Sequence, residues 1–285
     1  MLLRTYTGPR PKTALPPGAI DTQVHLYIDD YPALPGGPPL PPSAPGPDEY
    51  RQVMEWLGVE RLVVTIGNAH QADNSCLVDS LGKMGTIARG VAVISGETSD
   101  DEMKRLHDAG VRGARIMDLP GGAVGLDQLA VVDARAKEFG WTVAVQFDGS
   151  HILEHLSALR GIKSRFIIDH HGKFFSGTTP DSPEIDAVKG LIDRGNCWFK
   201  FAACYESSKS GAPDYADIAA VAREMAAYAP ERIVWGTNWP HNMVSRTEDY
   251  PDDAALLDLV LSWVPSEEGR RKMLVDNAEE LFDFV

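Results

Sequence analysis

The sequence predicts a single (β/α)₈ barrel, and three observations support this prediction. Eight short apolar segments of strand character alternate with eight stretches of helical character along the 285 residues. Three of the apolar segments, far apart in the chain, run directly into polar side chains. No glycine-rich fingerprint follows the first segment, which tells against the alternative of an open doubly wound sheet. A barrel of this kind typically has about 250 residues and builds its site at the strand ends.

The apolar segments and the helical stretches alternate in order. The segments with strand character lie near 19–25, 61–66, 90–94, 112–117, 141–147, 165–170, 197–201 and 232–237. The stretches with helical character span 47–57, 74–88, 99–109, 126–139, 150–159, 182–194, 215–228 and 252–263. Residues 98–101 (TSDD) are typical of a helix start, and Gly110, Gly140 and Gly195 stand where helices are expected to end.

The rest of the chain completes one barrel domain over residues 1–285. Residues 1–17 are predicted to form an N-terminal extension, and an amphipathic helix over 266–282 is predicted to close the base of the barrel. Residues 31–47 are dense in proline and follow the first strand, so we expect this loop to overhang the barrel mouth. Such a loop is either an inert, semi-rigid segment or a cover over the substrate.

Charge and cysteine usage narrow the partners and the compartment. A formal net charge of −14 argues against nucleic acid and anionic membranes, but local cations could still bind a small anion. The three cysteines form no CxxC pair, and no apolar run approaches a signal or membrane-spanning segment. We therefore expect a cytoplasmic protein. The outer helices do not reveal whether it forms a homo-oligomer.

Polar residues stand at most of the predicted strand ends. Lysine and arginine there are costly unless they are paired or face a ligand. Lys200 could instead pair with Glu206, and Arg115 is open to a similar structural reading. His170 and His171 are adjacent, so only one should point into the barrel, and we expect that to be His170. The candidates are Gln23, His25, Asn68, His70, Ser95, Glu97, Arg115, Gln146, His170, Lys200, Asn238 and His241.

Three of these strand ends carry recognisable motifs. Residues 21–25 (DTQVH), 168–172 (IDHHG) and 236–241 (GTNWPH) resemble the strand-one, mid-barrel and strand-eight motifs of the amidohydrolase superfamily. Residues 112–115 (RGAR) and 199–201 (FKF) fit the branch that contains the dicarboxylate and sugar lactonases. The resemblance extends from about Gly18 to Val285. It implies a small anionic sugar lactone as the substrate.

The chain departs from that family where metal-binding members hold their ions. Gln23 replaces the first histidine of the strand-one pair, Gln146 stands in the region of a bridging ligand, and Asn238 replaces the strand-eight aspartate. Neutral amides are poor partners for divalent ions. The resemblance therefore implies no catalytic metal and no other cofactor. An amide also cannot take a proton from water, so the usual base for hydrolysis is missing.

A lactone-binding site without that base suits intramolecular acyl transfer, in which a substrate hydroxyl attacks the lactone carbonyl. The expected reaction interconverts six-membered and five-membered lactones of an aldaric acid. The resemblance alone implies a place in the catabolism of galacturonic-type acids. We expect His170, His25 and Lys200 to be catalytic, the histidines as proton carriers. The expected substrate-binding residues are Arg115, as a carboxylate clamp, and Asn238, Gln23, Gln146, Asn68 and His241.

Three alternatives stay open. A lactonase without a metal would open the same lactone with water, and Asn238 is the residue that discriminates it. A metal-dependent decarboxylase of the superfamily is disfavoured by the weakened ligand set. A barrel that binds a sugar acid without turning it over would explain the missing histidine and aspartate equally well.

Overall fold

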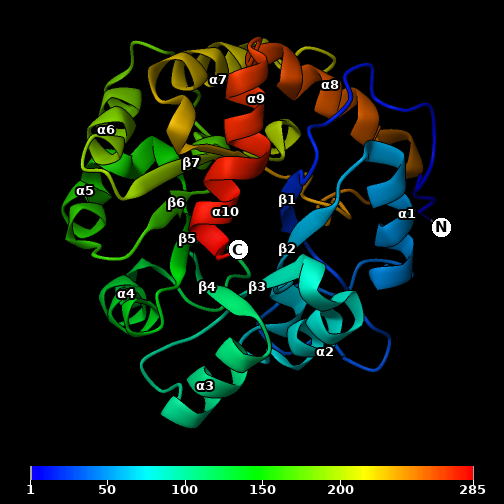
Figure 1. Cartoon of the computed structure of the whole chain (residues 1–285). Coiled ribbons are helices and arrows are strands. Elements are labelled where there is room, and N and C mark those ends of the chain that lie inside the picture. Colours follow the sequence, from blue (N-terminus) through cyan, green and yellow to red (C-terminus); the bar gives the residue numbers. More distant parts are fainter. Residues whose placement is uncertain (1, 285) are drawn as a thin grey trace.

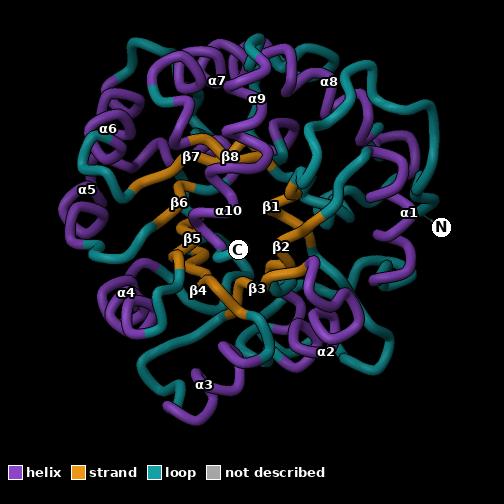
Figure 2. The backbone as a smooth tube through the Cα atoms, in the orientation of Figure 1, coloured by secondary structure: helices purple, strands orange, loops and turns teal. Residues whose placement is uncertain are grey.

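The computed structural model describes residues 2–284, and within them eight parallel strands form a ring surrounded by helices (Figures 1 and 2). The predicted (β/α)₈ fold class is confirmed. Met1 and Val285, the ends of the predicted domain, lie outside the described residues. The strands are β1 (Ile20–Val24), β2 (Arg61–Thr65), β3 (Ala88–Ala92), β4 (Val111–Met117), β5 (Thr142–Gln146), β6 (Phe166–Ile168), β7 (Cys197–Phe201) and β8 (Ile233–Trp235).

Ten α-helices accompany this ring in the described chain: one follows each strand on the outside, and two more come at the C-terminal end. They are α1 (Pro47–Leu57), α2 (Ser75–Met84), α3 (Asp100–Asp108), α4 (Leu129–Glu138), α5 (Ile152–Gly161), α6 (Pro183–Ile192), α7 (Ala216–Tyr228), α8 (Asp253–Trp263), α9 (Glu267–Arg271) and α10 (Asn277–Phe282). Local signals set their ends: the Ser99 hydroxyl accepts the Glu102 N–H at the start of α3, and Gly58 ends α1 with a φ of 83°.

Few hydrogen bonds close the ring between β8 and β1. The backbone N–H of Asn238 donates to Gln23 O at 2.9 Å, and that of His25 donates to Trp239 O at 2.8 Å. A side chain at Gly236 would meet Gln23 Cβ at 2.4 Å, so only glycine permits this approach. The Asp21 carboxylate adds a further hydrogen bond, accepting from the N–H of Thr237 at 3.0 Å. The closure thus brings residues 23–25 beside residues 236–239.

The base of the barrel is apolar and is plugged by α10, which lies inside the ring in Figure 1. Leu281 and Phe282 of α10 share one buried cluster with inward-facing residues of seven strands, among them Val63, Ile167 and Trp198. The single helix predicted over 266–282 is interrupted by a π-helical turn, Lys272–Asp276. That wider turn buries Met273, Leu274 and Val275 in succession, which a regular helix on a barrel surface would not do.

A polar layer lies directly above this apolar one. Side chains of a strand point alternately in and out, so the residue two positions further along faces the same interior. Five polar residues stand two positions after a residue of the lower layer: Thr65 after Val63, Arg115 after Gly113, Gln146 after Ala144, Asp169 after Ile167 and Lys200 after Trp198. The site candidates on these strands therefore share the upper interior of the barrel.

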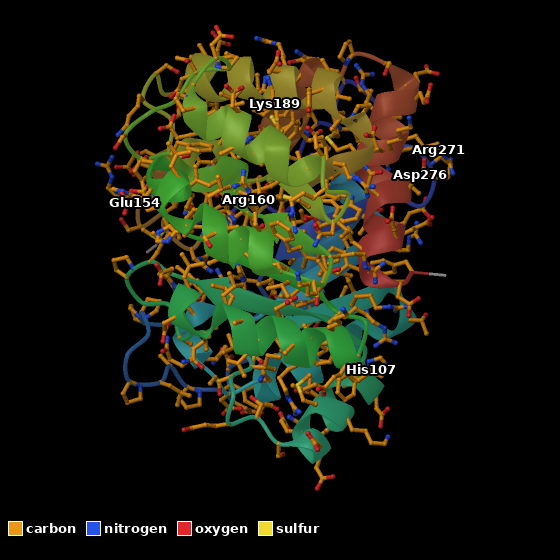
Figure 3. All side chains as sticks on the ribbon, turned by 90° about the vertical axis from the view of Figure 1, so that its left-hand side faces the viewer. His107, Glu154, Arg160, Lys189, Arg271 and Asp276 are labelled. Atoms are coloured by element: carbon orange, nitrogen blue, oxygen red, sulfur yellow. The ribbon has the colours of Figure 1, made fainter. Side chains whose placement is uncertain are left out.

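The two ends of the barrel are built differently. Figure 3 shows α9 and α10, with Arg271 and Asp276 labelled, at one end, and Glu154 at the start of α5 at the opposite end. Pro38, Pro39 and Pro41 of the proline-rich loop lie at the mouth, where they line a cavity. None of the helices between residues 2 and 284 is long and apolar enough to cross a bilayer.

Candidate active site

A cavity of about 110 Å³ opens at the C-terminal ends of the strands. Its wall holds two cations, two imidazoles, one carboxylate and several amides, with an apolar rim. The lining side chains are Arg115, Lys173, His25, His170, Glu206, Asn68, Gln146, Asn238, Asn242, Tyr27, Met117, Met243 and three prolines, Pro38, Pro39 and Pro41. Such a mixture suits a small, polar, anionic ligand.

The structure brings six of the nine predicted site residues to this wall: His25, His170, Arg115, Asn238, Gln146 and Asn68. The other three, Gln23, Lys200 and His241, are fully buried behind it. They can therefore act only through residues that line the cavity. His70, Ser95 and Glu97 also lie away from the wall; the His70 ring, for example, contacts Pro32 O at 3.2 Å.

Lys200 is held in the centre of the barrel. Its Nζ lies 2.8 Å from Asp169 Oδ1 and donates to Gln23 Oε1 at 2.7 Å. Burial opposes the charge of Asp169, but Lys200 and His170 outweigh it and hold the pKa of the Asp169 carboxyl well below its usual range. The alternative partner for Lys200, Glu206, pairs with Lys173 instead.

His25 is a neutral imidazole with a defined tautomer. Burial, aided by the Arg115 charge, lowers its pKa to about 3. Its Nδ1 lies 2.9 Å from Thr65 O, and because a carbonyl only accepts, Nδ1 carries the proton. Its Nε2, 3.4 Å from the Gln23 amide nitrogen, is therefore a hydrogen-bond acceptor. His25 can receive a hydroxyl proton in a hydrogen bond but is a weak base.

Arg115 is oriented by two of the predicted binding residues. Its Nη1 donates to Asn68 Oδ1 at 2.8 Å and to Ile66 O at 2.9 Å, and its Nη2 donates to Gln146 Oε1 at 2.8 Å. Its buried Nε has no hydrogen-bond partner among the described residues. The side-chain oxygens of Asn68 and Gln146 thus accept from the guanidinium, and its remaining N–H groups are available to donate to a ligand.

His170, Asn238 and Glu206 form a hydrogen-bonded chain along the wall. Asn238 Nδ2 donates to Glu206 Oε1 at 3.0 Å, which places the amide oxygen toward His170 Nε2, at 3.1 Å. His170 Nε2 must then be the donor. Both His170 and Asn238 have left-handed backbones, with φ of 53° and 65°. Histidine and asparagine tolerate that region better than most residues, which favours them at these two turns.

His171 points away from the cavity. Its ring stacks on Phe201 with centroids 5.0 Å apart and meets Trp263 edge-on, outside the strand ring. Burial, with a smaller effect from the His170 charge, lowers its pKa to about 3. The neighbouring histidines therefore have separate roles, one in the site and one in the packing.

Glu206 and Lys173 were missed as site residues from the sequence. Glu206 ends a short 3₁₀ turn, Cys204–Glu206, soon after β7, and an acidic residue so close to a strand end could have drawn attention to it. Burial raises the pKa of its carboxyl, but Lys173 and His170 lower it further and keep it below its usual range. Asn238 does replace the usual strand-eight base, but Glu206 puts another carboxylate, a weak base, on the cavity wall.

A divalent ion does not fit the donors at the strand ends. Among residues 2–284, no three His, Cys, Asp or Glu side chains are placed around one point. Gln23 Oε1 already accepts from Lys200, and Asn238 Oδ1 already accepts from His170. An ion placed between β1 and β7 would have to displace the Lys200 ammonium, against strong charge repulsion.

Comparisons with known proteins agree with this architecture. A family model described as Amidohydrolase matches residues 20–284. The chain is 55% identical over 282 residues to D-galactarolactone isomerase of Agrobacterium fabrum, with 99% of this chain and 96% of that protein covered. It is 30% identical to 4-sulfomuconolactone hydrolase of Hydrogenophaga intermedia, with 95% and 90% covered.

A solved structure gives the same result in three dimensions. The apo crystal structure of an Agrobacterium tumefaciens protein superimposes with a TM-score of 0.96 at 54% identity, covering 98% of this chain and 99% of that one. Agreement at this level extends over the whole barrel.

Proposed function

Because the chain belongs to the amidohydrolase family, we propose that it is a D-galactarolactone isomerase, which interconverts the six-membered and five-membered lactones of the aldaric acid. The observation that carries the proposal is the His170–Asn238–Glu206 chain beside Arg115, in a cavity sized for a small anion. The 55% identity to an enzyme of that name supports the substrate.

The reaction needs no external nucleophile. The attacking hydroxyl is carried by the carbon adjacent to the one that bears the ring oxygen. Its oxygen forms a new ester bond to the lactone carbonyl carbon, and the bond between that carbon and the ring oxygen breaks. The proton of the attacking hydroxyl ends on the released hydroxyl, so atoms balance. Effective molarities for such aligned groups reach about 10⁵ M or more. The protein has only to orient the ring, move one proton and stabilise the tetrahedral oxyanion.

The lining residues divide these tasks. Arg115 binds the free carboxylate, since its guanidinium is anchored on one side and retains free donors. Glu206 and His170 exchange the proton between the attacking and the leaving oxygen. The unprotonated Nε2 of His25 accepts a hydrogen bond from a substrate hydroxyl. Lys173, which lies on the wall, supplies positive charge to the carbonyl oxygen, because Lys200, which we expected to be catalytic, is buried behind the wall.

The proposed reaction requires neither a metal ion nor another cofactor. Lys200 provides a fixed positive charge among Asp169, Gln23 and, through Gln23, His25. The donor chemistry of the cavity supports this part of the proposal, because the amide oxygens that would face an ion are already engaged.

A lactonase is the second candidate, and Glu206 is the observation that favours it. A carboxylate on the wall could activate water, and the 30% identical relative is named a hydrolase. The depressed pKa of Glu206 argues for the isomerase. A hydroxyl that is already aligned with the carbonyl needs less activation than a free water, so a weak base can suffice for it.

The setting follows from the substrate. We place the enzyme in the cytoplasm, in the catabolism of galacturonic-type acids, with the anionic lactone as its partner. The net charge of −14 supports the exclusion of nucleic acid from its partners. The cations at the cavity act on the small anion locally, within a screening length of roughly 8–10 Å.

A carbon NMR time course tests the proposal. Protein treated with EDTA is given freshly generated six-membered galactarolactone, with a no-enzyme control. Accelerated formation of the five-membered lactone is expected. Accelerated formation of the open diacid would establish the lactonase. Tight binding of the lactone without turnover would establish a binding protein, and activity that returns only with added metal would overturn metal independence.

A further inference from the structure

A buried chain of hydrogen bonds leads from the active site to helix α8. Asn238 Nδ2 lies 3.1 Å from the Tyr205 hydroxyl, which lies 2.7 Å from His241 Nδ1. His241 Nε2 lies 3.0 Å from Asp253 Oδ1. The His241 side chain is fully buried and that of Asp253 is only 1% exposed. Asp253 and Tyr205 have no place on the cavity wall.

The chain has one direction of donation. The Asp253 carboxylate only accepts, so His241 carries its proton on Nε2, and its Nδ1 is an acceptor. The Tyr205 hydroxyl must donate to that nitrogen. Burial, with smaller effects from Glu206 and Asp253, raises the pKa of Tyr205 well above its ordinary value, so the hydroxyl keeps its proton. Tyr205 can then offer only a lone pair to Asn238.

The direction of hydrogen-bond donation also fixes the proton on His170. Asn238 presents its NH₂ group to the Tyr205 lone pair and to Glu206, and its oxygen to His170 Nε2. His170 Nε2 consequently holds a proton. We propose that Asp253 and Tyr205 are positioning residues, which act through His241 to fix the Asn238 amide and thereby the nitrogen of His170 that carries the proton. The activity readout rests on the proposed function, whereas the tautomer readout does not.

The loop after β8 is built for this task. His241 N–H donates to Asn238 O at 2.9 Å, and His241 has a φ of 59°, so the two residues are the ends of one tight turn. Asn238 faces the cavity and His241 faces α8. Fixing His241 from outside the barrel therefore also fixes the residue that contacts His170. Without Tyr205 the amide is held by Glu206 and His170 alone.

The test reads the His170 tautomer by nitrogen NMR of ¹⁵N-histidine-labelled protein, with the signal assigned by its loss in His170→Gln. The parent enzyme is expected to show His170 and His241 protonated on Nε2. Tyr205→Phe removes one oxygen and should move a measurable part of the His170 population to Nδ1, toward Asp169. Tyr228→Phe is the matched control: its hydroxyl donates to Asp193 at 2.7 Å, far from the site, and the tautomer should not change.

A second variant approaches the chain from its far end. Asp253→Asn keeps the shape but no longer forces the proton onto His241 Nε2, so both His241 tautomers are expected, with a smaller shift at His170. Circular dichroism melting checks the folding of each variant. A His170 tautomer that is unchanged in Tyr205→Phe overturns the proposal, as does a parent enzyme with His170 protonated on Nδ1 alone.

Kinetics separate positioning from simple structural support. For Tyr205→Phe we expect kcat to fall about tenfold, because a smaller fraction of His170 carries its proton on Nε2. KM should stay within threefold of the parent value, because the cavity wall is intact. A rise in KM with unchanged kcat would contradict a positioning role. If the parent enzyme shows no isomerase activity but the tautomer still responds to Tyr205, the proposed function fails and the positioning inference stands.

Discussion

The side-chain nitrogen of Asn238 lies 3.0 Å from Glu206 Oε1, and both residues line the cavity. A neutral amide thus stands beside a carboxylate that carries the negative charge of the wall. The amide stabilises that charge by donation, which helps to keep the pKa of Glu206 low. We expect this pair to decide between acyl transfer within the substrate and attack by water.

The first prediction concerns Asn238→Asp. A second carboxylate about 3 Å from Glu206 cannot ionise without repulsion, so one of the two pKa values should rise toward neutrality and supply a stronger base for water. We expect the ratio of open diacid to isomerised lactone to rise at least about tenfold, a gain typical of a positioned base. Carbon NMR of the two products measures it.

Asn68→Asp is the matched control. It also adds a carboxylate to the cavity wall, but beside Arg115 Nη1, 2.8 Å away, where the guanidinium keeps it ionised and weakly basic. Hydrolysis should stay near the parent level. Equal gains of hydrolysis in both variants would show that added charge, and not the position beside Glu206, is responsible.

Much of the fold could be predicted from the sequence because barrel strands carry local signals. Every predicted strand overlaps an observed one, although β6 and β8 are shorter than 165–170 and 232–237. Those strands end early because His170 and Asn238 adopt left-handed backbones that leave the sheet. The π-helical turn before α10 follows from packing against the barrel base, which no local pattern encodes.

The predicted residues on the cavity wall lie in a strand or at most three positions beyond its end. Arg115 and Gln146 were found because they are polar residues at predicted strand ends, where such barrels build their sites. Glu206 and Lys173 lie in loops, where spacing does not give direction. Lys200 was placed on the correct strand, but the sequence could not show that Asp169 and Gln23 enclose its ammonium.

The second prediction concerns Arg115→Lys. The lysine keeps the charge but loses the planar fork that Asn68 and Gln146 hold in place. We expect kcat/KM for the lactone to fall about 10–100-fold, mostly through KM, as loss of bidentate carboxylate binding predicts. Arg112→Lys, at the opposite end of β4, is the control and should stay within twofold. A fall in kcat alone would assign Arg115 to the chemical step.

The third prediction concerns acid stability. The folded-state pKa of His171 is about 3, below an unfolded value of roughly 6.5. Its stabilising effect is therefore complete above pH 6.5 and is lost as the pH falls toward 3, because the unfolded chain binds the proton first. Each such histidine contributes a slope of up to about 1.4 kcal/mol per pH unit.

His171→Phe should remove one such slope while keeping the ring stack on Phe201. Urea unfolding at pH 7.5, 6.0 and 5.0 should show the variant losing less stability than the parent as the pH falls. His25, whose pKa is also lowered to about 3, remains and keeps part of the dependence. His151→Gln, at an exposed histidine whose pKa is raised by Glu154, should not lessen it. Parallel pH curves for parent and His171→Phe would contradict the assignment.

The fourth prediction concerns the Lys200–Asp169 pair, whose side chains are both fully buried at a distance of 2.8 Å. Lys200→Met leaves the Asp169 charge buried without its partner and should lower the free energy of unfolding by about 3–5 kcal/mol. Lys200→Met combined with Asp169→Leu removes both charges and should recover most of that loss, because burying two ions is itself costly. Urea unfolding of the parent, both single variants and the double variant gives the coupling free energy. Additive losses would mean that the two charges do not depend on each other. A recovered but inactive double variant would show that this buried pair serves the site and not the stability of the barrel.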